Sequence, residues 1–204
     1  PFDSPATLLS EFEKVVSTEE DKYKKDENGV RFSTTLKFLA TRKIVSDYFL
    51  EVLFVEPKEL SADFKHSAMK LIVFFELFEV IEKLHQEKIS RPEEETFDYF
   101  FLGSSGLTIA YFAAFHGHSS FLQWLQSNGY QFLFKIKANA VSSIADAAAL
   151  RGQVSILQWL HNNGYTDLLR ARNSSGTSIA HYAASRGQVS ILQWLHNNGY
   201  TDLL

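Results

Sequence analysis

The feature that most constrains the fold is an exact internal duplication. The nineteen residues from Arg151 to Leu169, RGQVSILQWLHNNGYTDLL, recur letter for letter from Arg186 to Leu204, which is 35 residues later. One register earlier, residues 116–134 read HGHSSFLQWLQSNGYQFLF, the same pattern with substitutions. Repetition at a fixed period of about 20 to 50 residues is typical of stacked supersecondary units, because each unit buries its apolar face against a neighbouring copy. The sequence therefore predicts a solenoid of three copies.

Each copy has the pattern of two antiparallel helices followed by a turn-rich connection. In the third copy, Ser178 can cap a small-residue helix, SIAHYAASRG, that Gly187 closes. A second helix, VSILQWLHNNGY, begins near Val189, and the pair Asn198-Gly199 is a strong stop signal. The connection YTDLLRARNSSG has the turn chemistry of a projecting loop or hairpin. We therefore expect six repeat helices joined by fingers.

This helix-pair pattern resembles the ankyrin repeat, whose motif is G-x-T-P-L-H-x-A-A-x-x-G-H. In the third copy the motif falls on Gly176, Ser178, Ile179, Ala180, His181, Ala183, Ala184, Gly187 and Gln188. The corresponding positions of the other copies lie 35 and 70 residues earlier. The resemblance covers about half of the chain, from Gly103 to Leu204. It implies an all-α ankyrin-repeat solenoid with a period of 35 residues.

Several positions depart from the ankyrin pattern. The helix-opening Pro is isoleucine in all three copies, so its preset φ is lost. The motif histidine survives only as His181, and the resemblance implies that it braces the neighbouring loop. Val141 replaces the loop glycine of the middle copy, which predicts a distorted finger because a β-branched residue tolerates positive φ badly. The period of 35 exceeds the usual 33 of the family, which predicts longer fingers.

The N-terminal half shows no trace of the 35-residue period and reads as four to five helices. The longest apolar run extends from Ser67 to Lys88 and covers nearly the whole circumference of a helix. Such a helix is either buried or membrane-spanning, and this one is too short to span. The expected organisation is an N-terminal helical cap domain over residues 1–102 and a repeat array over 103–204, divided into 103–137, 138–172 and 173–204.

Composition and charge exclude several classes. The chain has 204 residues, of which 45% are hydrophobic, and it has no cysteine, which excludes disulfides and zinc–thiolate sites and fits a reducing, cytoplasmic compartment. Up to Leu102 there are 14 basic and 21 acidic residues, and after it 6 basic and 3 acidic. Neither half has the dense Lys/Arg stripe of a nucleic-acid binder. We expect no nucleic-acid partner and no membrane insertion.

Candidate catalytic and metal sites are weak. The pair His116 and His118 could hold a metal, but Gly-His is the helix-joint motif of the ankyrin family. Glu76, Glu79 and Glu82 could be paired carboxylates, although such spacing is more often the wet edge of an amphipathic helix. Trp124, Trp159 and Trp194 indicate packing, with Trp159 the most buried because its repeat has a neighbour on each side. We predict no catalytic residue, no metal and no cofactor.

The resemblance implies a protein-binding scaffold whose partner contacts finger tips, first helices and helix joints. Carried over copy by copy, these positions are Leu107, Phe115, His116, Asn139, Ser142, Leu150, Arg151, Thr177, Ser185 and Arg186. Phe115 and Leu150 stand out because they place apolar side chains on adjacent repeats where a monomer normally has polar ones. With a rim of His116, Arg151 and Arg186 they have the composition of a hot spot. The alternative is that the cap or a finger covers them.

Two function classes stay open. The first is a binding module, and the second is the substrate-recruiting or regulatory half of an enzyme whose catalytic part lies in the N-terminal helices or beyond Leu204. The weak catalytic signals favour the first. The recurring Gln-Trp-Leu and Asn-Gly-Tyr sequences, together with a Phe-rich helical cap, also resemble the general sequence character of ankyrin effectors that intracellular bacteria inject into host cells. That resemblance implies a host protein as partner, and the missing polar end repeat predicts further sequence after Leu204.

Overall fold

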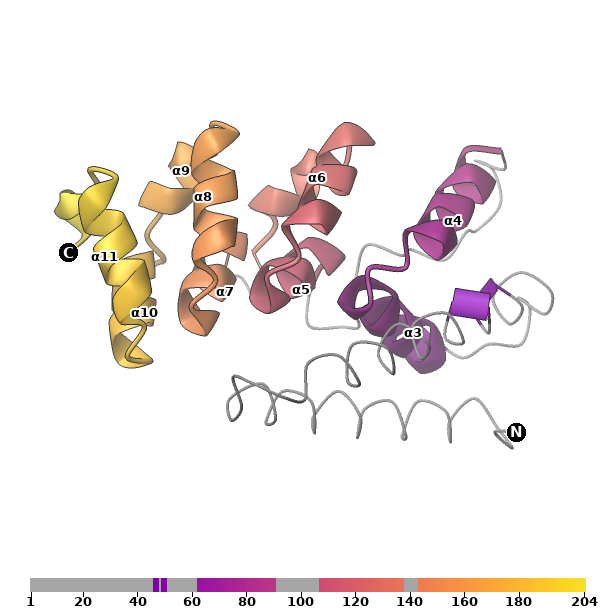
Figure 1. Cartoon of the computed structure of the whole chain (residues 1–204), viewed down its shortest axis with the longest axis horizontal. Coiled ribbons are helices and arrows are strands. Elements are labelled where there is room, and N and C mark those ends of the chain that lie inside the picture. Colours follow the sequence, from indigo (N-terminus) through magenta and orange to yellow (C-terminus); the bar gives the residue numbers. More distant parts are fainter. Residues whose placement is uncertain (1–45, 48, 51–61, 91–106, 138–142) are drawn as a thin grey trace, which may run out of the picture. The chain divides into compact units, whose positions relative to one another are not determined.

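The computed structural model describes residues 46–47, 49–50, 62–90, 107–137 and 143–204. The expected helices before residue 46 lie outside this set, as do parts of the fingers. The described residues form helices joined by turns and contain no β-strand (Figure 1), so the all-α prediction is confirmed. The chain divides into two compact units, Pro1–Thr96 and Phe97–Leu204, and each is described by itself.

In the first unit, the structure breaks the long apolar run into two helices. Helix α3 spans Ala62–Phe74 and helix α4 spans Phe78–Ser90, so the prediction of one helix from about residue 67 to 88 is wrong. The chain reverses at Glu76, whose φ of 50° lies in the left-handed region. The turn leaves Phe75 and Leu77 only 3% and 2% exposed. With this break, both helices still bury apolar side chains, such as Ile72 of α3 and Val80 of α4 with no exposed surface.

This break also separates the three glutamates that sequence spacing placed on one helix edge. Glu76 lies in the turn, whereas Glu79 and Glu82 lie exposed on α4. The three carboxylates therefore do not form one row along a continuous helix.

None of the described helices is long and apolar enough to cross a membrane.

In the second unit, all six helices expected of the three copies are present and lie in two rows (Figure 1). The first helices are α5 (Ile109–His116), α7 (Ile144–Arg151) and α10 (Ile179–Ser185). The second helices are α6 (Ser119–Ser127), α8 (Val154–Asn162) and α11 (Val189–Asn197). Helix α7 packs between α5 and α10, and α8 lies between α6 and α11. Their isoleucine, alanine and leucine side chains form the apolar core of the array.

Local chemistry explains where the first helices begin. The hydroxyl of Thr108 accepts a hydrogen bond from the backbone N–H of Tyr111 at 3.1 Å. Ser143 and Asp146 form a reciprocal capping box in which the Ser143 N–H donates to the carboxylate at 2.7 Å. In the third copy, the Nδ1 of His181 lies 2.8 Å from the Ser178 hydroxyl. The structure thus shows His181 contacting the start of its own helix, where the resemblance implied a brace to the neighbouring loop.

The long connection between copies is not a simple finger. Its first part forms a short helical turn in every copy, namely η1 (Gln131–Lys135), α9 (Thr166–Arg170) and η2 (Thr201–Leu203). These turns bury apolar side chains, such as Leu169 with no exposed surface. In the third copy the finger itself is a tight turn that closes with the Asn173 N–H donating to the Thr177 carbonyl at 3.0 Å. The first part of each connection is therefore a helical turn and not part of a finger, and the Val141 finger lies outside the described residues.

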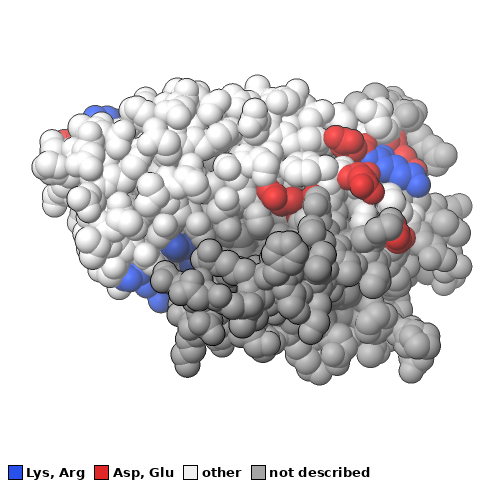
Figure 2. All heavy atoms as spheres, viewed as in Figure 1, with Lys and Arg blue, Asp and Glu red and all other residues white. Residues whose placement is uncertain are grey.

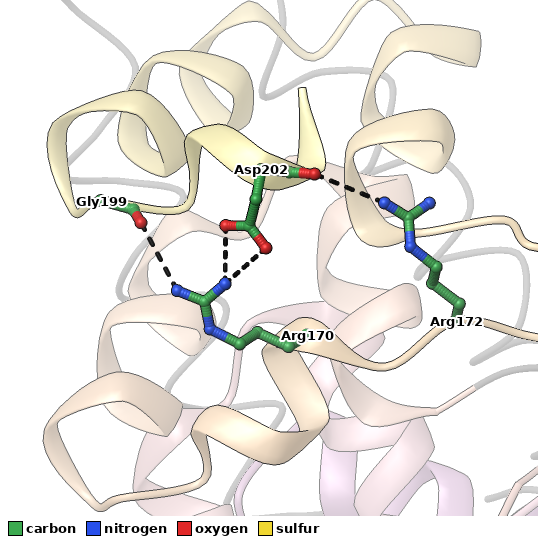
Figure 3. Close-up of polar contacts among 4 residues, drawn as sticks. All are labelled: Arg170, Arg172, Gly199 and Asp202. Atoms are coloured by element: carbon green, nitrogen blue, oxygen red, sulfur yellow. Dashed lines mark hydrogen bonds and ion pairs between the residues drawn. The ribbon is translucent and has the colours of Figure 1, made fainter.

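Polar contacts join successive copies along the short helical turns that follow the second helices. Arg170 of the second copy forms an ion pair with Asp202 of the third at 2.6 Å, and its guanidinium also reaches the Gly199 carbonyl (Figure 3). One copy earlier, Lys135 pairs with Asp167 at 3.5 Å. Because the same two positions pair at both junctions, the ladder is part of how the copies stack.

The tryptophans differ in burial from the expected order. Trp194 is only 7% exposed, whereas Trp159 is half-buried, so the prediction that Trp159 is the most buried is wrong. The rings of Trp159 and Trp194 both contact the copy that precedes them. The ring of Trp159 meets Phe134 at 5.6 Å between centroids. Trp194 donates its indole N–H to Gln158 at 2.8 Å and meets the edge of His161.

Candidate protein-binding surface

The candidate surface follows the ends of the first helices, where three equivalent positions form a row. Phe115 lies near the end of α5, Leu150 near the end of α7 and Ser185 at the end of α10. Phe115 and Leu150 are half-buried, and Ser185 is exposed. The apolar pair is therefore neither core nor fully open, and each side chain keeps part of its surface accessible on adjacent helices.

Phe115 lies in a small cluster at the junction of the first two copies. The guanidinium carbon of Arg151 lies 4.7 Å from the centre of the Phe115 ring. Tyr111 stacks on the same ring at 6.4 Å between centroids, one helical turn earlier. The amide of Gln153 donates to the Phe115 carbonyl at 3.4 Å, which ties the second copy to the end of α5. Contacts from two copies thus fix the position of the ring.

His116 does not serve as a basic rim at neutral pH. Burial, together with the charges of His118 and Arg151, lowers the pKa of its imidazole to about 4. Its ring lies against Phe112 at 4.4 Å between centroids. The predicted basic rim is therefore reduced to Arg151 and Arg186, both of which are exposed. No group of three or more possible metal ligands occurs among the described residues.

The other predicted contact residues are scattered around this row. Leu107 and Thr177 are half-buried, and Thr177 is held within its finger by the Asn173 side chain at 2.9 Å. The hydroxyl of Ser185 donates to the Tyr182 carbonyl at 2.9 Å and so turns back onto its own helix. Asn139 and Ser142 lie outside the described residues. Of the predicted set, the structure brings together Phe115, His116 and Arg151.

Sequence reasoning missed the aromatic residues that support this cluster. Tyr111 and Phe112 are half-buried on α5, one turn before Phe115 and His116 respectively. The spacing i, i+4 brings each pair to the same side of a helix. This i, i+4 spacing is visible in the sequence, but the ankyrin motif marks only the positions at the helix joint.

Comparison with known proteins identifies part of the array. A family model described as "Ankyrin repeats (many copies)" matches residues 145–196. This segment is an ankyrin-repeat segment. The matched range lies within the second and third copies, from α7 to α11. Searches of curated proteins and of solved structures found no match.

Ankyrin repeats are generally protein–protein interaction modules. The matched ankyrin segment contains Leu150, Arg151 and Arg186, so the two exposed arginines of the row lie inside it. Phe115 lies before it, in the copy that carries the diverged version of the duplicated sequence. The ankyrin segment and the preceding copy therefore share the candidate surface.

Proposed function

We propose that this chain is a scaffold that holds a partner protein against the ends of its first repeat helices. The central residues of the proposed surface are Phe115, Leu150, Arg151 and Arg186. The observation that carries the proposal is the half-buried Phe115 ring with the Arg151 guanidinium 4.7 Å from its centre. Aromatic residues and arginine are the side chains most enriched in binding hot spots.

The arrangement of this pair suits binding because its geometry exists before a partner arrives. Tyr111 and Arg151 both lie against the Phe115 ring, so little side-chain entropy is lost on association. A cation–π contact at an exposed site contributes about 0.5 to 1 kcal/mol and keeps the guanidinium near the ring. Half-buried apolar residues are common on protein surfaces. Here, however, two occur at the same position of adjacent copies.

The remaining predicted residues form the periphery of the proposed surface, namely Leu107, His116, Asn139, Ser142, Thr177 and Ser185. The proposed role of the array is binding, without chemistry of its own. The finer proposals are that the partner is a host protein and that the two meet in a reducing cytoplasm. The first rests on the resemblance of the sequence to injected ankyrin effectors, and the second rests on the lack of cysteine.

The test compares capture of partner proteins from a cell lysate by the intact chain and by Phe115→Ala. We expect the variant to lose tenfold or more of the captured partner, which is about 1.4 kcal/mol or more. Phe132→Ala is the matched control, because Phe132 is 52% exposed on η1, away from the helix ends. Equal capture by all three proteins, with unchanged thermal unfolding, would contradict the proposed surface.

A further inference from the structure

The third copy exposes apolar side chains whose equivalents in the second copy are covered. The second helices of the two copies have identical sequences, so equivalent positions can be compared directly. Leu157 of α8 has no exposed surface, whereas its equivalent Leu192 of α11 is half-buried. Val154 is half-buried, whereas Val189 is 68% exposed. Because the local sequence is the same, these differences come from the neighbour that each copy has.

The contacts that cover the second copy show what this face binds. Helix α10 packs on α7, and α11 packs on α8. The indole N–H of Trp194 donates to the Gln158 side chain at 2.8 Å. The hydroxyl of Tyr200 lies 2.8 Å from the Nδ1 of His161. A helix pair is therefore held on the second copy by apolar packing and by two side-chain hydrogen bonds.

A glycine at each helix joint receives a glutamine from the next copy. The side chain of Gln153 lies over Gly117, and that of Gln188 lies over Gly152, so close that a Cβ on either glycine would collide with the glutamine. Gly187 has the same positive φ, at 66°, but among the described residues nothing lies within 4 Å of where its Cβ would be. The third copy thus repeats the glycine site and leaves it open.

The outer face of the third copy, formed by Gly187, Val189, Leu192, Gln193 and His196, has the same chemistry as the covered face of the second. Gln193 and His196 stand where the hydrogen-bond partners of the indole and the phenol stand one copy earlier, and both are exposed. The sequence of α11 contains no Lys, Arg, Asp or Glu. In the view of Figure 2 most of the repeat surface is uncharged, and the blue side chains lie at its margins. The outer face is therefore apolar, uncharged and supplied with open hydrogen-bonding groups, which is the composition of an interaction surface.

We propose that this outer face binds a helix pair of the same repeat type on a separate polypeptide. The pair carries a glutamine before its second helix, a tryptophan six residues later and a tyrosine twelve residues later, as the third copy itself does. Its glutamine lies over Gly187, its indole N–H donates to Gln193 and its phenol reaches His196. The equivalent contacts between the second and third copies are all non-covalent, so a separate polypeptide can make them. This face is not the row of helix ends, so the inference goes beyond the proposed function and stands without it.

The probe is a fluorescent synthetic peptide with the sequence of residues 173–204, titrated against the intact chain by anisotropy. A single repeat cannot bury its apolar face alone, so the free peptide should be unfolded and should gain helical circular dichroism as it binds. A peptide of the same composition in scrambled order is the control. We expect it to bind at least tenfold more weakly. Equal binding of the two peptides would show unspecific apolar contact, and the inference would be wrong.

Two acidic substitutions in the first turn of α11 test the location of the site. Val189→Asp places an unpaired charge on the outer face and should weaken peptide binding tenfold or more. Ser190→Asp is the matched control, because its equivalent Ser155 stays exposed although the third copy covers the second. It should change binding less than twofold. An acid in the first turn of a helix is favourable, so both variants should fold, which thermal unfolding checks. Equal effects of the two variants would overturn the inference.

A double-mutant cycle tests the proposed indole contact. Gln193→Ala in the intact chain should weaken binding of the unmodified peptide about threefold to tenfold. It should have no effect on a peptide that carries Trp194→Ala, because the donor is then missing. Equal effects on both peptides would contradict the contact. If the peptide instead displaced the third copy of the chain, variants at Val189 and Gln193 would not weaken its binding, and the inference would fail.

Discussion

The duplicated segment allows one substitution to be compared in two identical local sequences. Trp159 and Trp194 have the same eight residues before them and the same ten after them. Replacing either by alanine changes helix propensity equally. A difference between Trp159→Ala and Trp194→Ala therefore measures tertiary environment. We expect Trp194→Ala to be the more destabilising.

The structure sets the size of the expected difference. Truncation of a buried Trp costs about 3 to 5 kcal/mol, and Trp194 is 7% exposed. Both rings stack on the tyrosine six residues later, so that contribution cancels. Trp194 additionally donates to Gln158, a bond of about 1 kcal/mol that the described structure does not show for Trp159. The Phe134 contact of Trp159 and the His161 contact of Trp194 are comparable aromatic pairs. We therefore expect Trp194→Ala to cost about 1 kcal/mol more.

Urea unfolding followed by circular dichroism measures both variants against the unmodified chain. Trp194→Phe and Trp159→Phe form an informative second pair, because both keep an aromatic ring and remove the indole N–H and the same ring volume. Trp194→Phe should lose about 1 kcal/mol more than Trp159→Phe, because only Trp194 donates its N–H to Gln158 in the described structure. An equal or larger cost for Trp159→Ala would refute the reasoning, because it would show that the different contacts with the preceding copies do not set the cost of truncation.

Three further predictions concern titratable groups. Because the pKa of His116 is lowered to about 4, the unfolded chain takes up a proton first, and stability should fall by about 1 to 2 kcal/mol as pH drops from 6.5 to 4. His116→Gln should flatten that part of a pH–stability curve. The Arg170 hydrogen bond lowers the pKa of Asp202, so its contribution is present above the unfolded value and lost as pH falls through the folded one. Asp202→Asn should therefore lower the unfolding temperature at low salt but not at high salt. Burial raises the pKa of Asp146 above its usual value of 3.8, so the unfolded chain loses this proton first as pH rises. The free energy of unfolding should therefore fall as pH rises above 3.8, and Asp146→Asn should remove this fall in the same pH titration.

Most of the array could be predicted from sequence because its signals are local. Hydroxyl caps such as Ser143 and stop pairs such as Asn198-Gly199 act within one or two turns, and the structure begins and ends helices at these positions. The period then places equivalent positions on adjacent copies. That is why Phe115 and Leu150 could be chosen together before their surroundings were known.

The N-terminal unit was harder to predict because its apolar pattern has no period. From Ser67 to Lys88, nothing in the residue types marks Glu76 as a turn, since glutamate is a good helix former. The reversal there depends on burying Phe75 and Leu77 together, and that gain comes from packing against other elements. The same reason explains the fingers: the helical turn with Leu169 is stabilised by burial, although its sequence has turn chemistry.

For the candidate surface, sequence determined the positions and tertiary structure decided their properties. The 35-residue period places His116, Arg151 and Arg186 at equivalent helix joints. Only packing shows that the imidazole is half-buried against Phe112 and neutral near pH 7, which leaves the two arginines as the basic rim. The pKa of a side chain depends on neighbours that lie far away in sequence.

The two identical nineteen-residue segments show this division most directly. Sequence alone determined that both segments fold into a helix that ends at an Asn-Gly pair, because this depends on residues within the segment. Tertiary structure decided that Trp194 is buried while Trp159 stays half-buried. Each indole packs against the copy before it, and those copies differ, with Gln158 and His161 facing one ring and Phe134 facing the other.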